Sequence, residues 1–310
     1  MSPERYAFLD IGTNTILCLI VEFAAGRFTI LDDLAEITRL GEGVDRTAQI
    51  SHEGERRSRE TLRRYLSQCT EFGVEKIFAV GTSALRDAKN SGDVCARFKK
   101  ELGLEVRVIT GDEEAAYSFL AVQKGLFLHG KELLVIDIGG GSTEFIRGND
   151  SGVSKALSVD IGSVRLTERF LHSDPVRAEE CAEMVAAIDR EILPLKDRSL
   201  KDKSELTVVG IAGTFTTLAA VEKKLERYVH SSVHGSILTL SEVRRQARLF
   251  EQRTIAERKA IPGLEPKRAD VIFAGARLIE RIMTLFNIAR IIVSDQGVRY
   301  GLLYGRLNSK

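Results

Sequence analysis

The sequence predicts an α/β protein made of two similar domains that face each other across a cleft. Runs typical of strands alternate with runs typical of helices along the whole 310-residue chain, which favours α/β architecture. This length exceeds the size at which a single hydrophobic core tends to split. The pattern Phe8–Gly12 near the N-terminus returns as Leu133–Gly139, so an internal duplication is predicted.

The first copy opens with a predicted β-meander whose first two strands are joined by a tight polar loop. Three short apolar runs form this meander, at Tyr6–Leu9, Ile16–Phe23 and Phe28–Leu31. A helix is predicted at Ser51–Phe72 because Ser51 is a good N-cap. The later elements expected in this copy are a strand at Lys76–Val80, a helix at Ser91–Leu102, a strand at Glu105–Ile109 and a helix at Glu113–Gly125.

The second copy restates the meander and then continues with helices and strands. Its first strands are predicted at Leu133–Gly139, Thr143–Ile146 and Val153–Val159. The elements expected after them are helices at Ser163–Phe170 and Ala178–Leu193, a solvated loop at Lys196–Glu205, a strand at Leu206–Ile211, helices at Ala212–Arg227, Leu240–Glu251 and Pro266–Phe286, a strand at Arg290–Ser294 and a closing helix at Gly297–Leu307. The boundary between the copies is expected near Gly125–Lys131.

The composition is that of an ordinary globular protein and disfavours several classes. With 45 basic and 44 acidic residues the net charge is +1, which predicts neither a nucleic-acid binder nor a membrane-surface protein. The four cysteines are scattered, which disfavours a disulfide framework or a zinc site. No apolar run approaches the roughly 20 residues of a membrane span, and no signal-peptide pattern opens the chain. A cytoplasmic location is therefore expected.

Two glycine-containing loops, one in each copy, are candidates for phosphate binding. A tight loop without bulky side chains can direct successive backbone N–H groups at an anion. An aspartate at the end of each preceding strand can hold a hydrated divalent cation. A plain hairpin turn is the alternative for one loop alone, and the repeated Asp-Ile-Gly disfavours it. The candidate phosphate-binding residues are Asp10, Gly12, Thr13, Asn14 and Thr15 in the first loop and Gly139, Gly140, Gly141, Ser142 and Thr143 in the second.

Two further turns join a strand to a helix and present helix N-termini, which attract anions. The third turn, Gly210–Thr217, offers Gly213 and Thr214 as candidate phosphate-binding residues. The fourth turn is Ser294–Arg299. An ordinary strand-to-helix junction accounts for the third turn equally well, so both interpretations of that turn stay open.

Three carboxylates, Asp112, Glu113 and Glu114, stand at the start of a predicted helix. Such a cluster commonly caps the helix and compensates its dipole. The alternative is that one carboxylate orients a water molecule for in-line attack on phosphorus. Arg86, which follows a predicted buried strand, is a candidate clamp for a phosphate oxygen, although a solvated surface arginine has the same signature.

Other hydrolase motifs are missing from the sequence. The five histidines show no metal-ligand spacing, and there is no G-x-S-x-G, P-loop lysine or H-E-x-x-H pattern. Serine-hydrolase, P-loop and zinc-hydrolase mechanisms are therefore disfavoured.

Taken together, these features resemble the exopolyphosphatase/guanosine pentaphosphatase (Ppx/GppA) family, within the actin, sugar-kinase and heat-shock-ATPase superfamily. The resemblance runs nearly end to end, and the combination of Asp137–Glu144 with Ile161–Glu168 is specific to the family. The other matching segments are Phe8–Thr15, Gly81–Arg86, Gly111–Ala115, Gly210–Ala219, Arg268–Ala276 and Ser294–Leu303.

The resemblance implies two ribonuclease-H-like, actin-like domains, at residues 1–125 plus 295–310 and at residues 126–294. It implies magnesium-assisted release of terminal phosphate from polyphosphate, or conversion of guanosine pentaphosphate to tetraphosphate. It places the catalytic glutamate on Glu114 and the phosphate-site arginine on Arg86, and it associates Asp137 and Glu144 with the metal or the catalytic water. A homodimer is the expectation from the family.

The sequence departs from the family pattern at Ala212–Thr214, commonly Gly-Gly-Thr, and at Asp295–Gly297, commonly Asp-Trp-Gly. Long family members also carry an additional C-terminal helical domain that is not expected here, so a short polyphosphate or a nucleotide is expected to suit the protein at least as well as a long chain. Two alternatives stay open: an ATP-dependent kinase of the same superfamily, and a non-catalytic sensor of guanosine tetraphosphate or polyphosphate.

Overall fold

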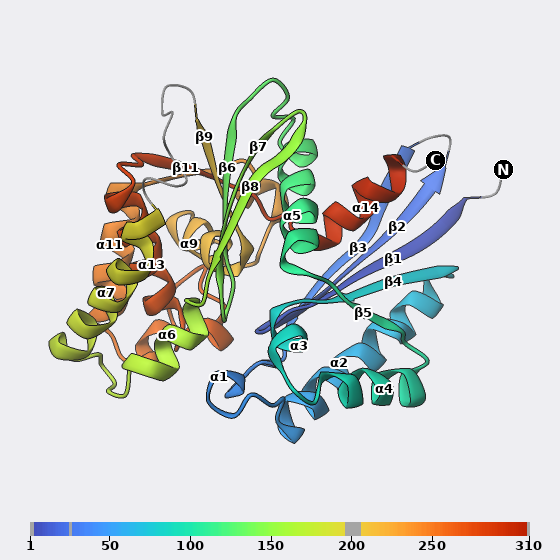
Figure 1. Ribbon diagram of the computed structural model, residues 1–310, viewed down its shortest axis with the longest axis horizontal. Helices are drawn as coiled ribbons and strands as arrows, with labels where there is room; N and C mark the ends of the chain where they lie inside the picture. Colours follow the sequence, from blue (N-terminus) through green and yellow to red (C-terminus); the bar gives the residue numbers. More distant parts are fainter. Residues whose placement is uncertain (1–2, 25–26, 196–205, 309–310) are drawn as a thin grey trace. The chain divides into compact units, whose positions relative to one another are not determined.

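The computed structural model describes residues 3–24, 27–195 and 206–308, and the chain divides into two compact units. The first unit comprises residues 1–117 and 298–310, and the second comprises residues 118–297. Each unit contains one sheet with helices packed on it (Figure 1), which confirms the predicted α/β class. The expected domain bounds differ from these units by a few residues and stay a prediction. The loop predicted at Lys196–Glu205 lies outside the described residues.

The first unit is built on a five-stranded sheet in the order β3-β2-β1-β4-β5. Its strands are β1 (Glu4–Ile11), β2 (Thr15–Ala24), β3 (Arg27–Ile37), β4 (Lys76–Gly81) and β5 (Val106–Val108). Strands β1, β2 and β3 pair antiparallel, which confirms the predicted meander, and β4 pairs parallel with β1. The helices are α1 (Val44–Thr47), α2 (His52–Glu71), α3 (Ser83–Asp87), α4 (Ser91–Leu102), α14 (Val298–Asn308) and the beginning of α5 (Gly111–Gly125).

Helices cover both faces of this first sheet. Alternate side chains of a strand point to opposite faces, and β1 carries apolar side chains on both. Leu9 belongs to the core that α2 and α4 cover. Tyr6 and Phe8 point to the other face, where the rings of Phe8 and Phe78 stack with centroids 5.3 Å apart. Arg306 of α14 lies 6.0 Å from the Tyr6 ring on that face. Figure 1 shows α2 and α4 on one side of the sheet and α14 on the other.

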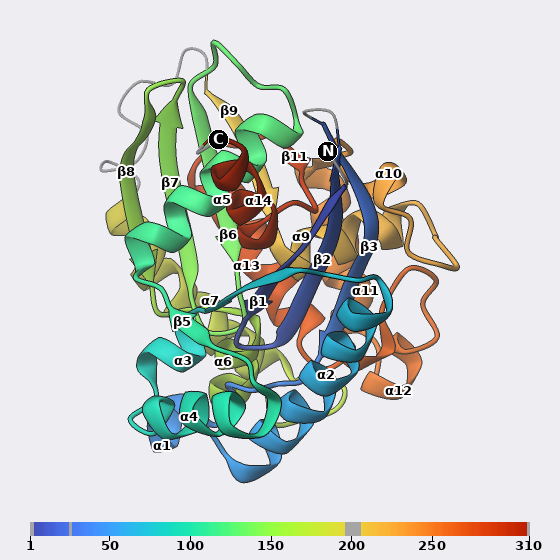
Figure 2. The same ribbon diagram turned by 90° about the vertical axis from the view of Figure 1, so that its right-hand side faces the viewer.

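The second unit repeats the pattern of the first on a six-stranded sheet, in the order β10-β11-β9-β6-β7-β8. Its strands are β6 (Leu133–Ile138), β7 (Thr143–Asn149), β8 (Gly152–Val159), β9 (Thr207–Ile211), β10 (Ile237–Thr239) and β11 (Arg290–Val293). Strand β6 pairs antiparallel with β7, beside which it lies in Figure 2, and parallel with β9. In the same way β1 pairs antiparallel with β2 and parallel with β4. The predicted duplication is therefore confirmed at the level of strand pairing.

Helices cover both faces of the second sheet as well. Leu134 and Ile136 belong to the core under α7 (Ala178–Ile192), α11 (Leu240–Glu251) and α13 (Ile272–Leu285). On the opposite face, α5 lies against β7 (Figure 1), and a Cβ atom at Gly148 would lie 2.7 Å from the Phe119 ring. The shorter elements of this unit are α6 (Ser163–Phe170), η1 (Leu193–Leu195), α9 (Ala212–Glu222), α10 (His230–Val233), α12 (Ile255–Arg258) and η2 (Pro266–Arg268).

The prediction of a single helix at Pro266–Phe286 is wrong, because this segment forms η2 and α13 with a turn between them. The buried guanidinium of Arg258 donates to the carbonyl of Ala269 at 3.2 Å, inside that turn. Arg258 also donates to the carbonyl of Phe250 at 2.7 Å, so one distant side chain holds two backbone oxygens. A contact of this kind has no local sequence signal.

The helix predicted at Ala212–Arg227 ends earlier, at Glu222. Lys224 has a positive φ of 51°, and the N–H of Leu225 returns to the carbonyl of Ala220 at 3.1 Å. The helix therefore ends at a residue in the left-handed conformation, Lys224, where glycine is the usual residue. No sequence signal marked this ending.

Candidate phosphate-binding residues in each unit

The two predicted phosphate loops close with the same hydrogen bond. In the first loop the N–H of Gly12 donates to the carbonyl of Thr15 at 3.1 Å, and in the second the N–H of Gly139 donates to the carbonyl of Ser142 at 3.0 Å. A Cβ atom would lie 3.0 Å from the acceptor at Gly12 and 3.3 Å from it at Gly139, so both turns favour glycine. The duplication therefore extends to the geometry of the loops.

The backbone N–H groups at the tips of both loops are available to an anion. Within residues 3–24, 27–195 and 206–308, no described hydrogen bond uses the N–H groups of Thr13, Asn14, Gly140, Gly141 or Ser142 as donors. Successive unpaired N–H groups in a tight turn form an anion-binding nest. Each unit thus has one loop that fits a phosphate oxygen.

The first loop is held from behind by neighbouring segments. The hydroxyl of Thr13 lies 2.9 Å from that of Ser83, at the start of α3. The carbonyl of Thr13 accepts from Gly41 at 2.9 Å, and the carbonyl of Asn14 accepts from Thr38 at 3.0 Å. The carbonyls of Thr13 and Asn14 therefore already accept hydrogen bonds, while their N–H groups stay available. The N–H groups give this side of the loop a partial positive charge.

Arg86 and Glu114 form an ion pair in the same unit as the first loop. Arg86 Nη1 lies 2.9 Å from Glu114 Oε2 and also donates to the carbonyl of Ile109 at 3.2 Å. Burial raises the pKa of Glu114, the bond and charge of Arg86 lower it, and the Asp87 carboxylate raises it further, so the net shift is upward. A raised pKa makes this carboxylate a stronger base than an exposed glutamate.

The three carboxylates at the start of α5 divide into different environments. Glu113 accepts from the N–H of Thr110 at 2.9 Å, while the hydroxyl of Thr110 accepts from the N–H of Glu113 at 3.2 Å, a reciprocal helix cap. The capping interpretation therefore holds for Glu113. Glu114 takes no part in that cap and is largely buried beside Arg86.

Asp10, at the end of β1, is a second buried acid in the first unit. Its Oδ1 atom is buried and has no hydrogen-bond partner among the described residues. Burial raises the pKa of Asp10 to about 7, the Glu114 carboxylate adds to the rise, and the Arg299 guanidinium opposes it. An unsatisfied buried acceptor of this kind suits a cation or a hydrogen-bond donor of a ligand.

In the second unit, Asp137 and Glu144 lie directly opposite each other on β6 and β7. Cross-strand partners have Cβ atoms roughly 5 Å apart on one face, which is within reach of a single ion. Ser118 donates to Asp137 at 3.3 Å, and Ser158 donates to Glu144 at 3.0 Å. Nowhere in the described chain do three or more His, Cys, Asp or Glu side chains gather as a metal site. The two carboxylates fit Mg²⁺, which commonly takes one or two carboxylates together with water and substrate phosphates.

The family-specific segment Ile161–Glu168 supports the second loop. The N–H of Ser163 donates to the carbonyl of Gly139 at 3.0 Å, and the N–H of Val164 donates to the carbonyl of Gly140 at 2.9 Å. Thr143, the last residue predicted in this loop, donates its hydroxyl proton to the carbonyl of Ile161 at 2.6 Å. The beginning of α6 thus takes the carbonyls of the loop and leaves its amides available.

The third turn lies next to the second loop and carries a cation that the sequence prediction did not assign. A Cβ atom at Gly213 would lie 2.2 Å from Arg268 Nη1, so the guanidinium packs directly on the turn. A Cβ atom at Gly275 would lie 2.5 Å from Thr214 Cγ2 and 3.4 Å from Ser163 Cβ, which links the turn to α6. The matching segment Arg268–Ala276 was a signal for Arg268, but its sequence alone did not indicate what it contacts.

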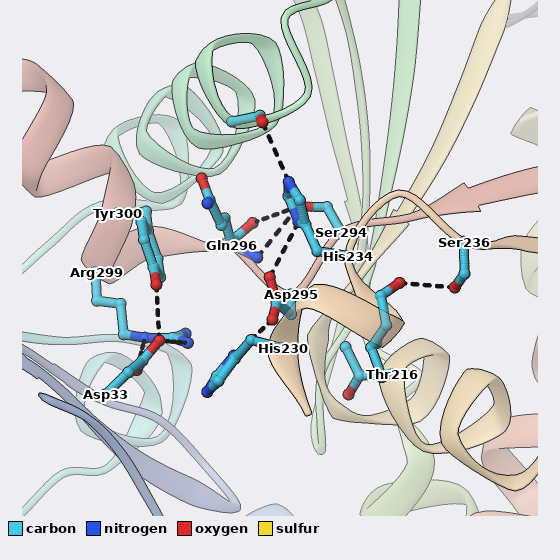
Figure 3. Close-up of polar contacts among 12 residues, drawn as sticks. Asp33, Thr216, His230, His234, Ser236, Ser294, Asp295, Gln296, Arg299 and Tyr300 are labelled. Carbon is cyan, nitrogen blue, oxygen red and sulfur yellow. Dashed lines mark hydrogen bonds and ion pairs between the residues drawn. The ribbon is translucent and has the colours of Figure 1, made fainter. Parts of the chain in front are cut away.

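The predicted site residues thus form one group in each unit. The first unit gathers Asp10, Gly12, Thr13, Asn14, Thr15, Arg86 and Glu114, and the second gathers Asp137, Gly139, Gly140, Gly141, Ser142, Thr143, Glu144, Gly213 and Thr214. The fourth turn differs from the others, because its Asp295 lies between two imidazoles, those of His230 and His234 (Figure 3).

Comparison with known proteins places the chain in one family. The model of the Ppx/GppA phosphatase family matches residues 19–310. Exopolyphosphatase 2 of Mycobacterium tuberculosis is 36% identical over 291 residues, which cover 91% of each chain. A bifunctional 3-dehydroquinate synthase/phosphatase of Fusobacterium nucleatum is 33% identical over 313 residues. That match covers 98% of this chain and 47% of the longer protein, so this chain spans about half of it.

A solved structure agrees with the sequence relatives. The crystal structure of the Aquifex aeolicus member of the Ppx/GppA family is 34% identical and superposes with a TM-score of 0.81, covering 99% of this chain and 98% of that one. The chain therefore has the two-domain actin-like fold of these proteins. Among the helices that the structure describes, none is both long and apolar enough to cross a bilayer.

Proposed function

Because the chain belongs to the Ppx/GppA phosphatase family, we propose that it hydrolyses the terminal phosphoanhydride bond of inorganic polyphosphate, of guanosine pentaphosphate, or of both. The observation that carries the proposal is the buried Glu114 carboxylate, held by Arg86 at 2.9 Å in the same unit as the first phosphate loop. A similar protein carries the name exopolyphosphatase, which supports polyphosphate as a substrate.

The first loop and Arg86 would bind the terminal phosphoryl group. The amides of Thr13 and Asn14 in the first unit are suited to phosphate oxygens, and so are those of Gly140 and Gly141 in the second unit. Positioning and positive charge provide most of the catalysis in phosphoryl transfer, because little covalent chemistry is left to the protein. Preformed donors of this kind need no rearrangement as charge develops.

Glu114 would act as the general base. The oxygen of a water molecule attacks the terminal phosphorus, the bond from that phosphorus to the bridging oxygen breaks, and the shortened phosphate chain leaves with the electron pair. The proton of the water passes to Glu114, whose raised pKa favours the transfer. Arg86 fixes the orientation of the carboxylate through its bond to Oε2.

Asp137 and Glu144 would hold Mg²⁺, since their opposed carboxylates fit a cation that keeps water and phosphate ligands. When bound, the ion would neutralise charge on the phosphate oxygens. The hydroxyls of Ser118 and Ser158 fix the two carboxylates, at 3.3 and 3.0 Å. We also propose that the protein forms a homodimer, a proposal that rests only on its resemblance to the family. Analytical ultracentrifugation would measure the oligomeric state.

The decisive experiment measures phosphate release from short polyphosphate, long polyphosphate and guanosine pentaphosphate with magnesium. We expect Glu114→Gln to reduce kcat by about 10² to 10⁴-fold, the usual contribution of a general base, with substrate binding largely retained. Glu113→Gln is the matched control in the same helical turn, and it should leave kcat largely unchanged, because the amide oxygen of glutamine can accept the Thr110 N–H bond of the reciprocal cap as glutamate does.

Each other outcome selects an alternative. Unchanged turnover in Glu114→Gln would remove the glutamate from the mechanism. Tight binding by calorimetry without phosphate release by the wild type would favour a sensor. Transfer of phosphate from ATP to an acceptor would favour a kinase.

A further inference from the structure

Helix α5 ends with its last backbone carbonyls fully paired, and one of them is paired by a distant side chain. Three of these carbonyls accept backbone hydrogen bonds. The N–H of Leu126 donates to the carbonyl of Val122 at 3.0 Å, that of Phe127 to Lys124 at 3.4 Å and that of Leu128 to Gln123 at 3.1 Å. Phe127 has a positive φ of 53°, as a Schellman ending requires. The carbonyl of Gly125 takes no part in this pattern, and His234 Nε2 lies 3.1 Å from it.

The other nitrogen of His234 also faces an acceptor. Nδ1 lies 3.0 Å from Asp295 Oδ1, so the imidazole stands between a carboxylate and a carbonyl (Figure 3). A neutral imidazole has one donor and one acceptor nitrogen, whereas the protonated ring has two donors. Only the protonated ring satisfies both of these partners. Its charge also lies at a helix C-terminus, where the helix dipole favours a cation.

Asp295 keeps its own charge in this environment. Only 6% of its side chain is exposed, and its second oxygen lies 2.6 Å from His230 Nδ1. Burial alone would raise the pKa of Asp295, but the bonds from His230 and His234 bring it well below its usual range. Burial likewise lowers the pKa of His234, and the bonds to Asp295 and Gly125 outweigh it, so the pKa of His234 is raised.

The segments that His234 joins are those through which the chain passes from one unit to the other. The chain leaves the first unit after Tyr117, within α5, and returns to it at Val298. Gln296 packs on the end of α5, because a Cβ atom at Gly125 would lie 2.1 Å from its Oε1 atom. Its N–H is held by the Ser294 hydroxyl at 3.1 Å. Both segments are therefore fixed to each other inside the second unit.

We propose that protonated His234 is a positioning residue, which joins the end of α5 to the turn at 294–297 and so fixes the helix whose first turn carries Glu114. The consequence for catalysis rests on the proposed function, and the junction itself does not. When His234 loses its proton it keeps one donor nitrogen, so either the bond to the Gly125 carbonyl or the contact with Asp295 is lost, and the link between the two segments is broken. The titratable groups in this contact are Asp295 in the turn, which pairs with His234, and His230 on α10, which pairs with the other oxygen of Asp295.

The protonation state is tested first, by following the imidazole nitrogens of the ¹⁵N-labelled protein between pH 5.5 and 9.5. We expect both nitrogens of His234 to be protonated at pH 7 and its midpoint to lie above the ordinary value of a histidine. In Asp295→Asn the midpoint of His234 should fall. A neutral His234 at pH 7, or a midpoint unchanged in Asp295→Asn, would overturn the proposal.

The junction is tested by amide hydrogen exchange at the end of α5. In His234→Gln, which is uncharged at every pH, we expect the N–H groups of Leu126 and Leu128 to exchange about two- to tenfold faster at pH 7. In the wild type the same loss, corrected for intrinsic exchange, should appear only above the midpoint of His234. His172→Gln, an exposed histidine in the same unit, should behave as the wild type. Equal protection in His234→Gln and wild type would contradict the junction.

The link to catalysis is tested by the pH dependence of phosphate release. We expect the kcat of the wild type to fall several-fold above the midpoint of His234 with KM unchanged, and His234→Gln to have the lower kcat at all pH values without that transition. A pH profile identical in both proteins would remove the link. If the wild type released no phosphate from any substrate, the proposed function would fail, while the nitrogen titration and the exchange data would still decide the junction.

Discussion

At the scale of single residues, Asp10 stands in an environment that disfavours its charge. Burial raises its pKa to about 7, with a further rise from Glu114 and partial relief from Arg299. The pKa is higher in the folded than in the unfolded chain, so ionisation of Asp10 destabilises the fold. This penalty is absent below the unfolded value of about 4, grows as the pH rises and is complete above about pH 7.

We therefore expect Asp10→Asn to stabilise the protein more at pH 8 than at pH 5. The difference between the two pH values should be about 2 kcal/mol, because part of the penalty already exists at pH 5. Urea unfolding of the variant and the wild type at both pH values measures it. Phosphate release should fall at the same time, as expected where a functional residue is kept at a cost in stability.

The exposed Asp112→Asn is the control for this prediction, and its stability difference should stay constant over the same range. A constant difference in Asp10→Asn as well would show that the Asp10 carboxyl is not perturbed in the fold.

At the scale of elements, the contact between α6 and the second loop depends on the space at Gly162. Its φ of −149° is open to any residue, so the requirement for glycine comes from packing alone. A Cβ atom there would lie 2.5 Å from the carbonyl carbon and oxygen of Gly140. Gly162→Ala should therefore cost about 1–3 kcal/mol by overpacking and displace the loop.

Phosphate release in Gly162→Ala should fall about tenfold or more, since small displacements of a phosphate-binding loop are costly for catalysis. Gly92→Ala on α4 is the matched control, because a Cβ atom there meets nothing within 4 Å. That control should be neutral or slightly stabilising. Wild-type activity in Gly162→Ala would mean that α6 does not position the loop.

The elements that the sequence predicted well are those with local signals. Both loops were located because strand, glycine and hydroxyl residues follow one another over a short stretch, as in Asp10–Thr15 and Gly139–Thr143. The break before α13 was missed because its cause, Arg258, reaches the carbonyl of Ala269 from another helix. The role of Ile161–Glu168 in holding the second loop was also not predictable, since it consists of backbone bonds between separate segments.

At the scale of the whole molecule, the candidate site also contains residues with a local sequence signal and residues whose contacts come from distant segments. The duplication predicted two loops of one kind, and the structure gives both loops the same closing bond. The position of Arg268 on Gly213 and that of His234 at the end of α5 arise only when distant segments fold together. A residue that reaches a site from a distant segment has no motif around it that names its partner, whereas the residues of one turn follow one another in a recognisable motif.

The first unit is completed by the last segment of the chain, and one buried ion pair joins that segment to the sheet. Arg299 of α14 donates two bonds to Asp33 on β3, at 2.8 and 3.0 Å, and the hydroxyl of Tyr300 donates a third at 2.8 Å (Figure 3). The side chains of Arg299 and Asp33 are only 6% and 7% exposed. Removing one partner of a buried pair leaves an uncompensated charge, which typically costs about 3–5 kcal/mol.

We expect Arg299→Met to destabilise the first unit selectively. Hydrogen exchange should quicken in β1 and β2 while β6 and β9 keep their protection, because the second unit has its own core. Arg281→Met is the reciprocal control, since Arg281 pairs with Asp189 in the second unit and the two are 23% and 27% exposed. That partly solvated pair should be worth about 1 kcal/mol or less, with the loss confined to the second unit.

A double variant separates the buried charge from the packing of α14. Asp33→Asn combined with Arg299→Met removes both charges of this pair, so it should recover part of the protection that Arg299→Met loses. If the double variant were as unstable as the sum of the two single variants, the ion pair would not be the cause. If Arg299→Met loosened both sheets equally, the two units would unfold as one, and the C-terminal helix would stabilise the whole chain and not only the unit that it completes.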